Sequence, residues 1–219
     1  MNSSLNRGLH RETVLGAGSA EETIARQHGS TGVYAGIRVE VRPLARGKGT
    51  MFVWAAGANI PARFAIAVAR GVQDALSVGV LSGLDLTDVL ISVEDGSYHD
   101  IDSSEAAFQD VAHKATTAAV RRANPTVLEA VSICRVTFPS AYAKAIQQMV
   151  SPQEGEYAPA ESEFRNLSLT VTVPTSSVNN LLERVLVITN GQAKFSIESA
   201  GFRAKPDPPD AVNTWPSTT

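Results

Sequence analysis

The spacing of apolar residues in the first half of the chain predicts three strands. Between residues 33 and 41, apolar residues recur two or four positions apart, with polar Arg38 and Glu40 between the later ones. This period of two predicts a half-buried strand that ends at Pro43. Further short strands are predicted at 51–54 and 86–93. Asp95–Gly96 follows the last of these and is typical of a tight turn.

Two helices are predicted in the same half, because apolar residues there recur three and four positions apart. The first begins at Pro61, the favoured place for proline, and ends near Gly79. Its buried face is predicted to hold Phe64, Val68, Val72, Ala75 and Leu76. The second begins near Ser103, with Asp102 as N-cap and Glu105 completing a pair similar to a capping box. It ends before Asn124–Pro125.

The second half predicts a smaller α+β unit. Strands are expected at 133–138, 167–173 and 193–197, helices at 139–149 and after Pro174, and a loop at 151–160. This order resembles the ferredoxin-like motif with one strand unclear. We therefore divide the chain into a lead-in segment at 1–18, a first domain at 19–125, a second at 126–203 and a disordered tail at 204–219.

Composition narrows the class of protein. Hydrophobic residues make up 43% and charged residues 19%, as in soluble globular proteins. The net charge of −3 argues against a binder that relies on general attraction to nucleic acid. The single cysteine, Cys134, excludes an internal disulfide and fits a reducing compartment. Neither a membrane-spanning run nor a secretory leader is visible, so a cytoplasmic protein without membrane contact is expected.

The densest polar cluster lies at residues 94–105, and its residues alone leave three interpretations open. His99 with nearby aspartates could form an acid–base or metal site. The carboxylates could simply cap the following helix. The loop could also recognise RNA, since Tyr98 can stack, His99 can donate a hydrogen bond and Gly96 allows a close backbone approach. A second loop at 28–32 fits either RNA contact or an ordinary hairpin turn.

The run Asp95-Gly-Ser-Tyr-His-Asp-Ile-Asp-Ser-Ser-Glu-Ala-Ala-Phe108 closely resembles domain IV of bacterial elongation factor G. Other segments resemble the same family in the same order: Arg11-Glu12-Thr13 the junction before domain IV, and Phe138-Pro139 the entry into domain V. The resemblance runs from about Leu9 to Phe202. It implies a ribosomal-protein-S5-like domain IV followed by a ferredoxin-like domain V.

In this family, two loops at the tip of domain IV enter the decoding centre and keep the tRNA–mRNA duplex paired during translocation. The resemblance therefore implies the ribosome as partner, including its RNA and the tRNA–mRNA complex. The residues in the positions of these loops are His28, Gly29, Ser30, Thr31, Gly32, Gly96, Ser97, Tyr98, His99 and Asp100. No phosphate-binding loop of a nucleoside triphosphatase occurs. We therefore expect no enzyme activity, metal or cofactor in this chain. GTP and Mg²⁺ would bind a GTPase domain in a longer parent chain or a partner.

The chain departs from the family pattern in two places. The first loop lacks the family's arginine, and the segment Ser151–Glu154 is not basic where domain V usually is. Both changes remove positive charge that would contact phosphate. Three alternatives remain beside translocation. Thr189-Asn190-Gly191 resembles the proteins that protect ribosomes from tetracycline, the lost basic residues are consistent with a decayed fragment, and His99 with its carboxylates could belong to a small acid–base enzyme.

Overall fold

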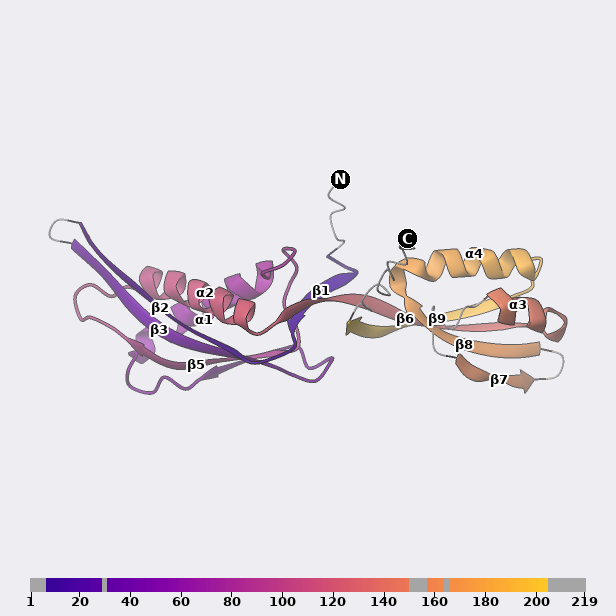
Figure 1. Cartoon of the computed structure of the whole chain (residues 1–219), viewed down its shortest axis with the longest axis horizontal. Helices are drawn as coiled ribbons and strands as arrows, with labels where there is room; N and C mark the ends of the chain where they lie inside the picture. Colours follow the sequence, from indigo (N-terminus) through magenta and orange to yellow (C-terminus); the bar gives the residue numbers. More distant parts are fainter. Residues whose placement is uncertain (1–6, 29–30, 150–156, 164–165, 205–219) are drawn as a thin grey trace, which may run out of the picture.

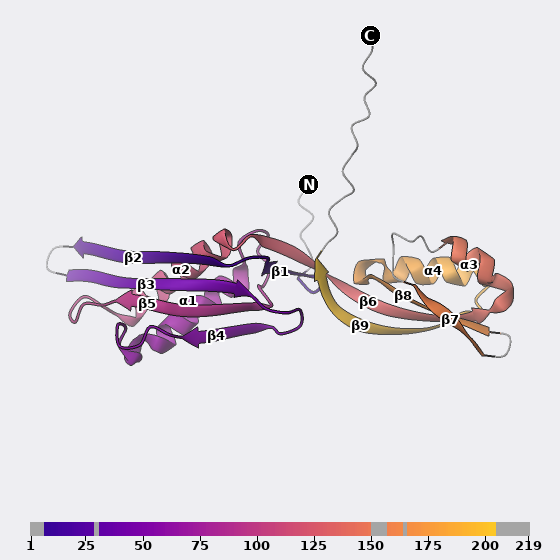
Figure 2. The same cartoon turned by 60° about the horizontal axis from the view of Figure 1, so that its bottom comes forward.

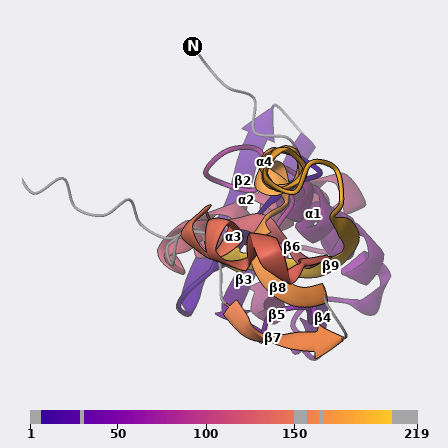
Figure 3. The ribbon, with the colours of Figure 1, turned by 90° about the vertical axis from the view of Figure 1, so that its right-hand side faces the viewer.

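The computed structural model describes residues 7–28, 31–149, 157–163 and 166–204, and it shows two lobes arranged end to end (Figure 1). Each lobe is a β-sheet with helices packed on one face (Figures 1 and 2). Viewed along the long axis, the second lobe lies in front of the first (Figure 3). The mixture of sheets and helices confirms the predicted α+β class. Within the described ranges, no helix is long and apolar enough to cross a membrane.

The first lobe contains a four-stranded sheet in the order β2-β3-β5-β4. Its strands are β2 (Gly18–His28), β3 (Thr31–Pro43), β4 (Thr50–Trp54) and β5 (Val89–Ser97). Neighbouring strands are antiparallel except β4, which runs parallel to β5. The helices are the short η1 (Ala62–Phe64), α1 (Ala65–Val78) and α2 (Glu105–Arg122). Both long helices cover one face and leave the other face of the sheet open (Figure 1).

The core of this lobe lies between the sheet and the two helices. The apolar residues of β3 that were predicted to alternate, Ile37, Val39 and Val41, are buried. All five predicted core residues of the first helix are buried as well. The rings of Phe64 and Phe108 stack at the centre, with centroids 4.5 Å apart. The apolar periodicities therefore predicted β3 and α1 correctly, although Val33 itself is exposed.

The second lobe follows the order strand, helix, two strands, helix and strand. Its elements are β6 (Pro125–Pro139), η2 (Ser140–Tyr142), α3 (Ala143–Met149), β7 (Tyr157–Glu163), β8 (Asn166–Pro174), η3 (Thr175–Ser177), α4 (Val178–Ile188) and β9 (Lys194–Ala204). Strand β6 lies between β8 and β9, and β7 pairs with the other side of β8, all antiparallel. This arrangement is the ferredoxin-like motif that the sequence predicted.

Strand β1 (His10–Val14) joins the lobes. It pairs with residues 125–129 of β6, on the side where β8 pairs further along the same strand. The buried carboxylate of Glu12 accepts four backbone N–H groups from the loop after α1. Oε2 accepts from Val80 and Leu81 at 2.6 and 3.0 Å, and Oε1 accepts from Ser82 and Leu84 at 2.7 and 3.4 Å. Through Glu12, a loop of the first lobe is tied to a strand that belongs to the sheet of the second.

The alternation of apolar and polar residues did not predict β1 or β2. Residues 1–18 were expected to be an irregular lead-in, yet 10–14 form β1 and Gly18 begins β2. Strand β2 lies at an edge of the sheet and buries only Ala20 and Ile24 among its apolar side chains. An edge strand needs few large apolar residues, so the alternation there is weak.

Two local predictions around the polar cluster were wrong. The third strand lies at 89–97 rather than 86–93, and Asp95–Gly96 continues it instead of turning. The pairing of β5 with β3 continues past this point, with a shift in register between Arg38 and Val39. Helix α2 is capped by Ser104, whose Oγ accepts from Ala107 N at 3.2 Å, and not by Asp102.

The first and last strands of the second lobe are longer than predicted. Strand β6 extends the predicted 133–138 in both directions, and β9 extends well past residue 197 because its far end still pairs with β6. Strand β7 begins inside the predicted 151–160 loop. Residues 150–156 and the predicted tail at 205–219 lie outside the described residues.

Candidate functional site

The polar cluster forms the connection between β5 and α2 at the end of the molecule farthest from the second lobe (Figure 1). We call residues 98–104 the tip loop. The end of β2 and the start of β3 lie at the same end of the molecule, where His28 pairs with Thr31. The predicted site residues Gly29 and Ser30 lie outside the described residues. A Cβ added to Gly32 would lie 2.4 Å from Asp102 Oδ1, so the two predicted segments touch.

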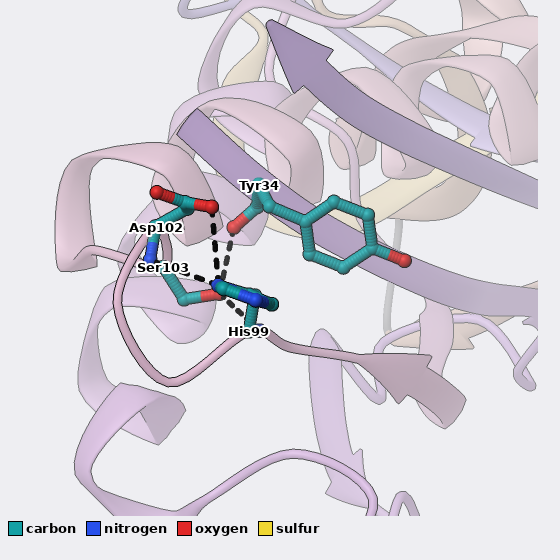
Figure 4. Close-up of polar contacts among 4 residues, drawn as sticks. All are labelled: Tyr34, His99, Asp102 and Ser103. Atoms are coloured by element: carbon teal, nitrogen blue, oxygen red, sulfur yellow. Dashed lines mark hydrogen bonds and ion pairs between the residues drawn. The ribbon is translucent and has the colours of Figure 1, made fainter. Parts of the chain in front are cut away.

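Hydrogen bonds to β3 hold the tip loop in place (Figure 4). The hydroxyl of Ser103 accepts from His99 N at 2.9 Å and donates to the carbonyl oxygen of Tyr34 at 2.8 Å. Ser103 N donates to His99 O at 3.0 Å, and Tyr34 N donates to Asp102 O at 2.9 Å. These contacts fix the backbone on both sides of residues 100–101 before any partner binds, which reduces the ordering cost of binding.

The imidazole of His99 faces Asp102 (Figure 4). Nδ1 lies 3.3 Å from Asp102 N and 3.1 Å from Asp102 Oδ2. In the neutral ring, either Nδ1 accepts the backbone N–H and Nε2 carries the proton, or Nδ1 donates to the carboxylate and Nε2 is an acceptor. In the charged ring, Nδ1 donates to the carboxylate and Nε2 also carries a proton. The His99 side chain is 55% exposed, and Nε2 is the ring nitrogen left for a partner.

The tip loop also exposes one aliphatic and one aromatic side chain. Ile101 is 86% exposed and Tyr98 is 39% exposed, and Asp100 lies between them in the chain. Ile101 is not among the predicted site residues, although it is the one apolar aliphatic residue in the polar run 94–105. Tyr34 and Ser103 were also missed as positioning residues, because their contact spans 69 positions of the chain.

Gly96 and Ser97 lie below the tip, inside β5. A Cβ on Gly96 would lie 2.4 Å from Ile60 Cδ1, so this glycine allows close packing rather than a close approach of RNA. Ser97 Oγ lies 2.9 Å from the hydroxyl of Tyr34. Asp95 Oδ1 accepts from Asn59 Nδ2 at 2.8 Å and from Gly96 N at 2.7 Å. These two hydrogen bonds, the Asn59 one foremost, lower the pKa of Asp95, which keeps its carboxylate charged.

The geometry favours recognition over catalysis at His99. The histidine and its aspartate lie on a protruding loop, whereas catalytic groups usually line a concave site. Among the described residues, no group of three or more His, Cys, Asp or Glu could hold a metal ion. Asp95, Asp100, Asp102 and Glu105 give the loop and its base a negative charge. Such a loop suits base edges, ribose and stacked surfaces better than phosphates.

Comparisons with known proteins show which proteins the chain is similar to. The family model described as "Elongation factor G, domain IV" matches residues 9–124. The chain is 32% identical over 201 residues to elongation factor G of Dehalococcoides mccartyi, and this match covers 91% of the chain and 29% of the relative. It is 33% identical over 198 residues to elongation factor G of Chlamydia caviae, covering 90% and 28%. The chain thus spans less than a third of these relatives.

A solved crystal structure of a protein from Thermus thermophilus has a similar fold. It superposes with a TM-score of 0.80 at 25% identity and covers 90% of this chain and 30% of its own. The similarity therefore includes both lobes.

Proposed function

Because the chain belongs to the elongation factor G family, we propose that it acts on the ribosome through the tip loop. In this proposal, the loop enters the decoding centre and contacts the paired tRNA and mRNA while they move. The observation that carries it is the network around Ser103, which presents His99 and Ile101 at the end of an elongated lobe. A fixed, protruding imidazole next to an exposed apolar side chain suits a narrow RNA surface read by shape.

In this proposal, GTP is not bound by this chain. The chain spans 29% of its first relative, and no phosphate-binding loop occurs in its sequence. We propose that GTP and Mg²⁺ bind another part of a longer protein or a separate partner.

Co-sedimentation of the purified chain with ribosomes at low and moderate salt tests the proposal. We expect saturable binding that His99→Ala weakens by roughly 2- to 12-fold, since one lost hydrogen bond corresponds to about 0.5–1.5 kcal/mol. Ser103→Ala should weaken binding in the same way, because it removes two of the hydrogen bonds that hold the loop. His113→Ala, a histidine on α2 away from the tip, is the matched control.

The outcomes separate the two parts of the proposal. A folded chain that does not bind ribosomes at either salt concentration excludes action on the ribosome by this module alone. Equal binding by the wild type and all three variants excludes the tip loop as the contact.

A further inference from the structure

Strand β4 is one of the two edge strands of the first sheet, and its surface is apolar. Four apolar residues follow Thr50 in this strand, and Met51, Phe52 and Val53 are 51%, 40% and 41% exposed. Natural edge strands are usually protected by charged residues or proline. Strand β4 carries neither, so it is open to pairing with another strand.

The hydrogen-bonding groups of this edge form a symmetrical set. Val89 N donates to Gly49 O at 3.1 Å, and Ala55 N donates to Val93 O at 2.8 Å. In a parallel ladder, every second residue of a strand bonds to a given neighbour, so residues 49, 51, 53 and 55 face β5. Thr50, Phe52 and Trp54 therefore direct their N–H and C=O groups outward, with Phe52 at the midpoint.

We propose that β4 pairs antiparallel with β4 of a second copy of this chain, about a two-fold axis at Phe52. In this register, Phe52 faces its own counterpart, Met51 faces Val53 of the second copy, and Thr50 faces Trp54. The outward groups of the two strands then form six ladder hydrogen bonds. The exposed apolar side chains become cross-strand pairs on both faces, which stabilise sheets. The contact uses the same patch twice, as two-fold interfaces do.

Charges at the two ends of β4 favour the antiparallel direction. The exposed Lys48 precedes the strand, and the exposed Glu94 lies beside its far end on β5. Antiparallel pairing brings Lys48 of each copy toward Glu94 of the other. A parallel arrangement would bring like ends together, with no such pairing of opposite charges.

A hollow on the open face of the sheet adds to this argument. It has a volume of about 150 Å³ and is lined by Glu40, Arg42, Val53, Leu90, Ser92 and Glu94. The proposed register places Met51 of the second copy across from Val53, at the edge of this hollow. Methionine fills irregular gaps well because its side chain is unbranched and flexible.

Sedimentation of the chain over a range of concentrations tests the proposal. We expect a reversible dimer that Phe52→Lys weakens roughly tenfold or more, since it places two like charges at the centre of the ladder. Val53→Lys should act in the same direction from the other face of the strand. Val187→Lys is the matched control, because Val187 is 77% exposed on α4 of the other lobe. A chain that stays monomeric, or a dimer unchanged by both β4 variants, overturns the proposal.

Oxidative cross-linking tests the register itself. Met51 and Val53 of the second copy form a non-hydrogen-bonded pair, with Cα atoms about 4.5 Å apart and within reach of a disulfide. An equimolar mixture of Met51→Cys and Val53→Cys should form a mixed disulfide. A mixture of Ile66→Cys and Val187→Cys, both exposed, should not, and the buried Cys134 stays in place in every chain. A yield no higher than that of the control pair overturns the register.

Discussion

Replacing Glu12 by glutamine tests whether its carboxylate holds the loop after α1. Each oxygen accepts two backbone N–H groups, so the NH₂ of glutamine must face two N–H donors and leave them without partners. A buried unsatisfied donor costs about 1–3 kcal/mol. The contact from Leu84 to Oε1 is long, at 3.4 Å, so we expect the NH₂ on that side. The loss of unfolding free energy should then be about 2–4 kcal/mol, a large share of the 5–15 kcal/mol typical of a domain.

Urea unfolding followed by tryptophan fluorescence measures this loss. The chain has two tryptophans, and Trp54 packs against the core of the first lobe. In a Trp215→Phe background, the signal therefore comes from Trp54 and from the first lobe. The exposed Glu21→Gln is the matched control and should change stability by less than about 0.5 kcal/mol. A loss below about 1 kcal/mol for Glu12→Gln would refute the idea that these four contacts hold the loop.

Three further predictions concern single side chains. Gly96→Ala should destabilise the first lobe by about 1–3 kcal/mol, because its Cβ would collide with Ile60; urea unfolding measures this. The lowered pKa of Asp95 makes a contribution to stability that is present above the unfolded-state pKa and is lost as pH falls through the folded-state pKa. The stability difference between wild type and Asn59→Ala should therefore shrink in acid, and a constant difference would contradict this. Burial raises the pKa of the Cys134 thiol, so native protein should resist alkylation at pH 8 until urea unfolds it, as mass spectrometry can show.

The sequence predicted those parts of the fold where packing is periodic. The buried faces of β3 and α1 repeat every two and every three to four residues, and both elements were found. Strand β2 was not predicted, because its helix-facing side carries Glu22 between Ala20 and Ile24 and so interrupts the apolar alternation. The pair Asp95–Gly96 looked like a turn because its local chemistry is that of a turn. In the structure, both residues pair with Ile37 and Arg38 of β3, which no local pattern reveals.

The position of the candidate site in the chain was predictable, but the contacts that hold its loop were not. The run 95–108 located the loop and His99 within it. The capping residue, however, is Ser104 and not Asp102, since Asp102 lies against His99 instead. The support from Tyr34 comes from a strand far away in the chain. Sequence patterns identify which residues are available to a loop, while long-range contacts decide which of them hold it and which are presented.

Strand β6 gives the molecule resistance to a pull along its long axis. At about 3.3 Å per residue, its fifteen residues extend over roughly 50 Å, and they pair with β1 at one end and with β8 and β9 along the rest. A pull along the long axis therefore loads these ladders in shear, where many hydrogen bonds resist at once, instead of opening them one by one. Strand β6 also transmits a rotation of the second lobe to the first. Because His99 lies at the far end of the molecule, a small rotation angle gives a larger sideways displacement of His99.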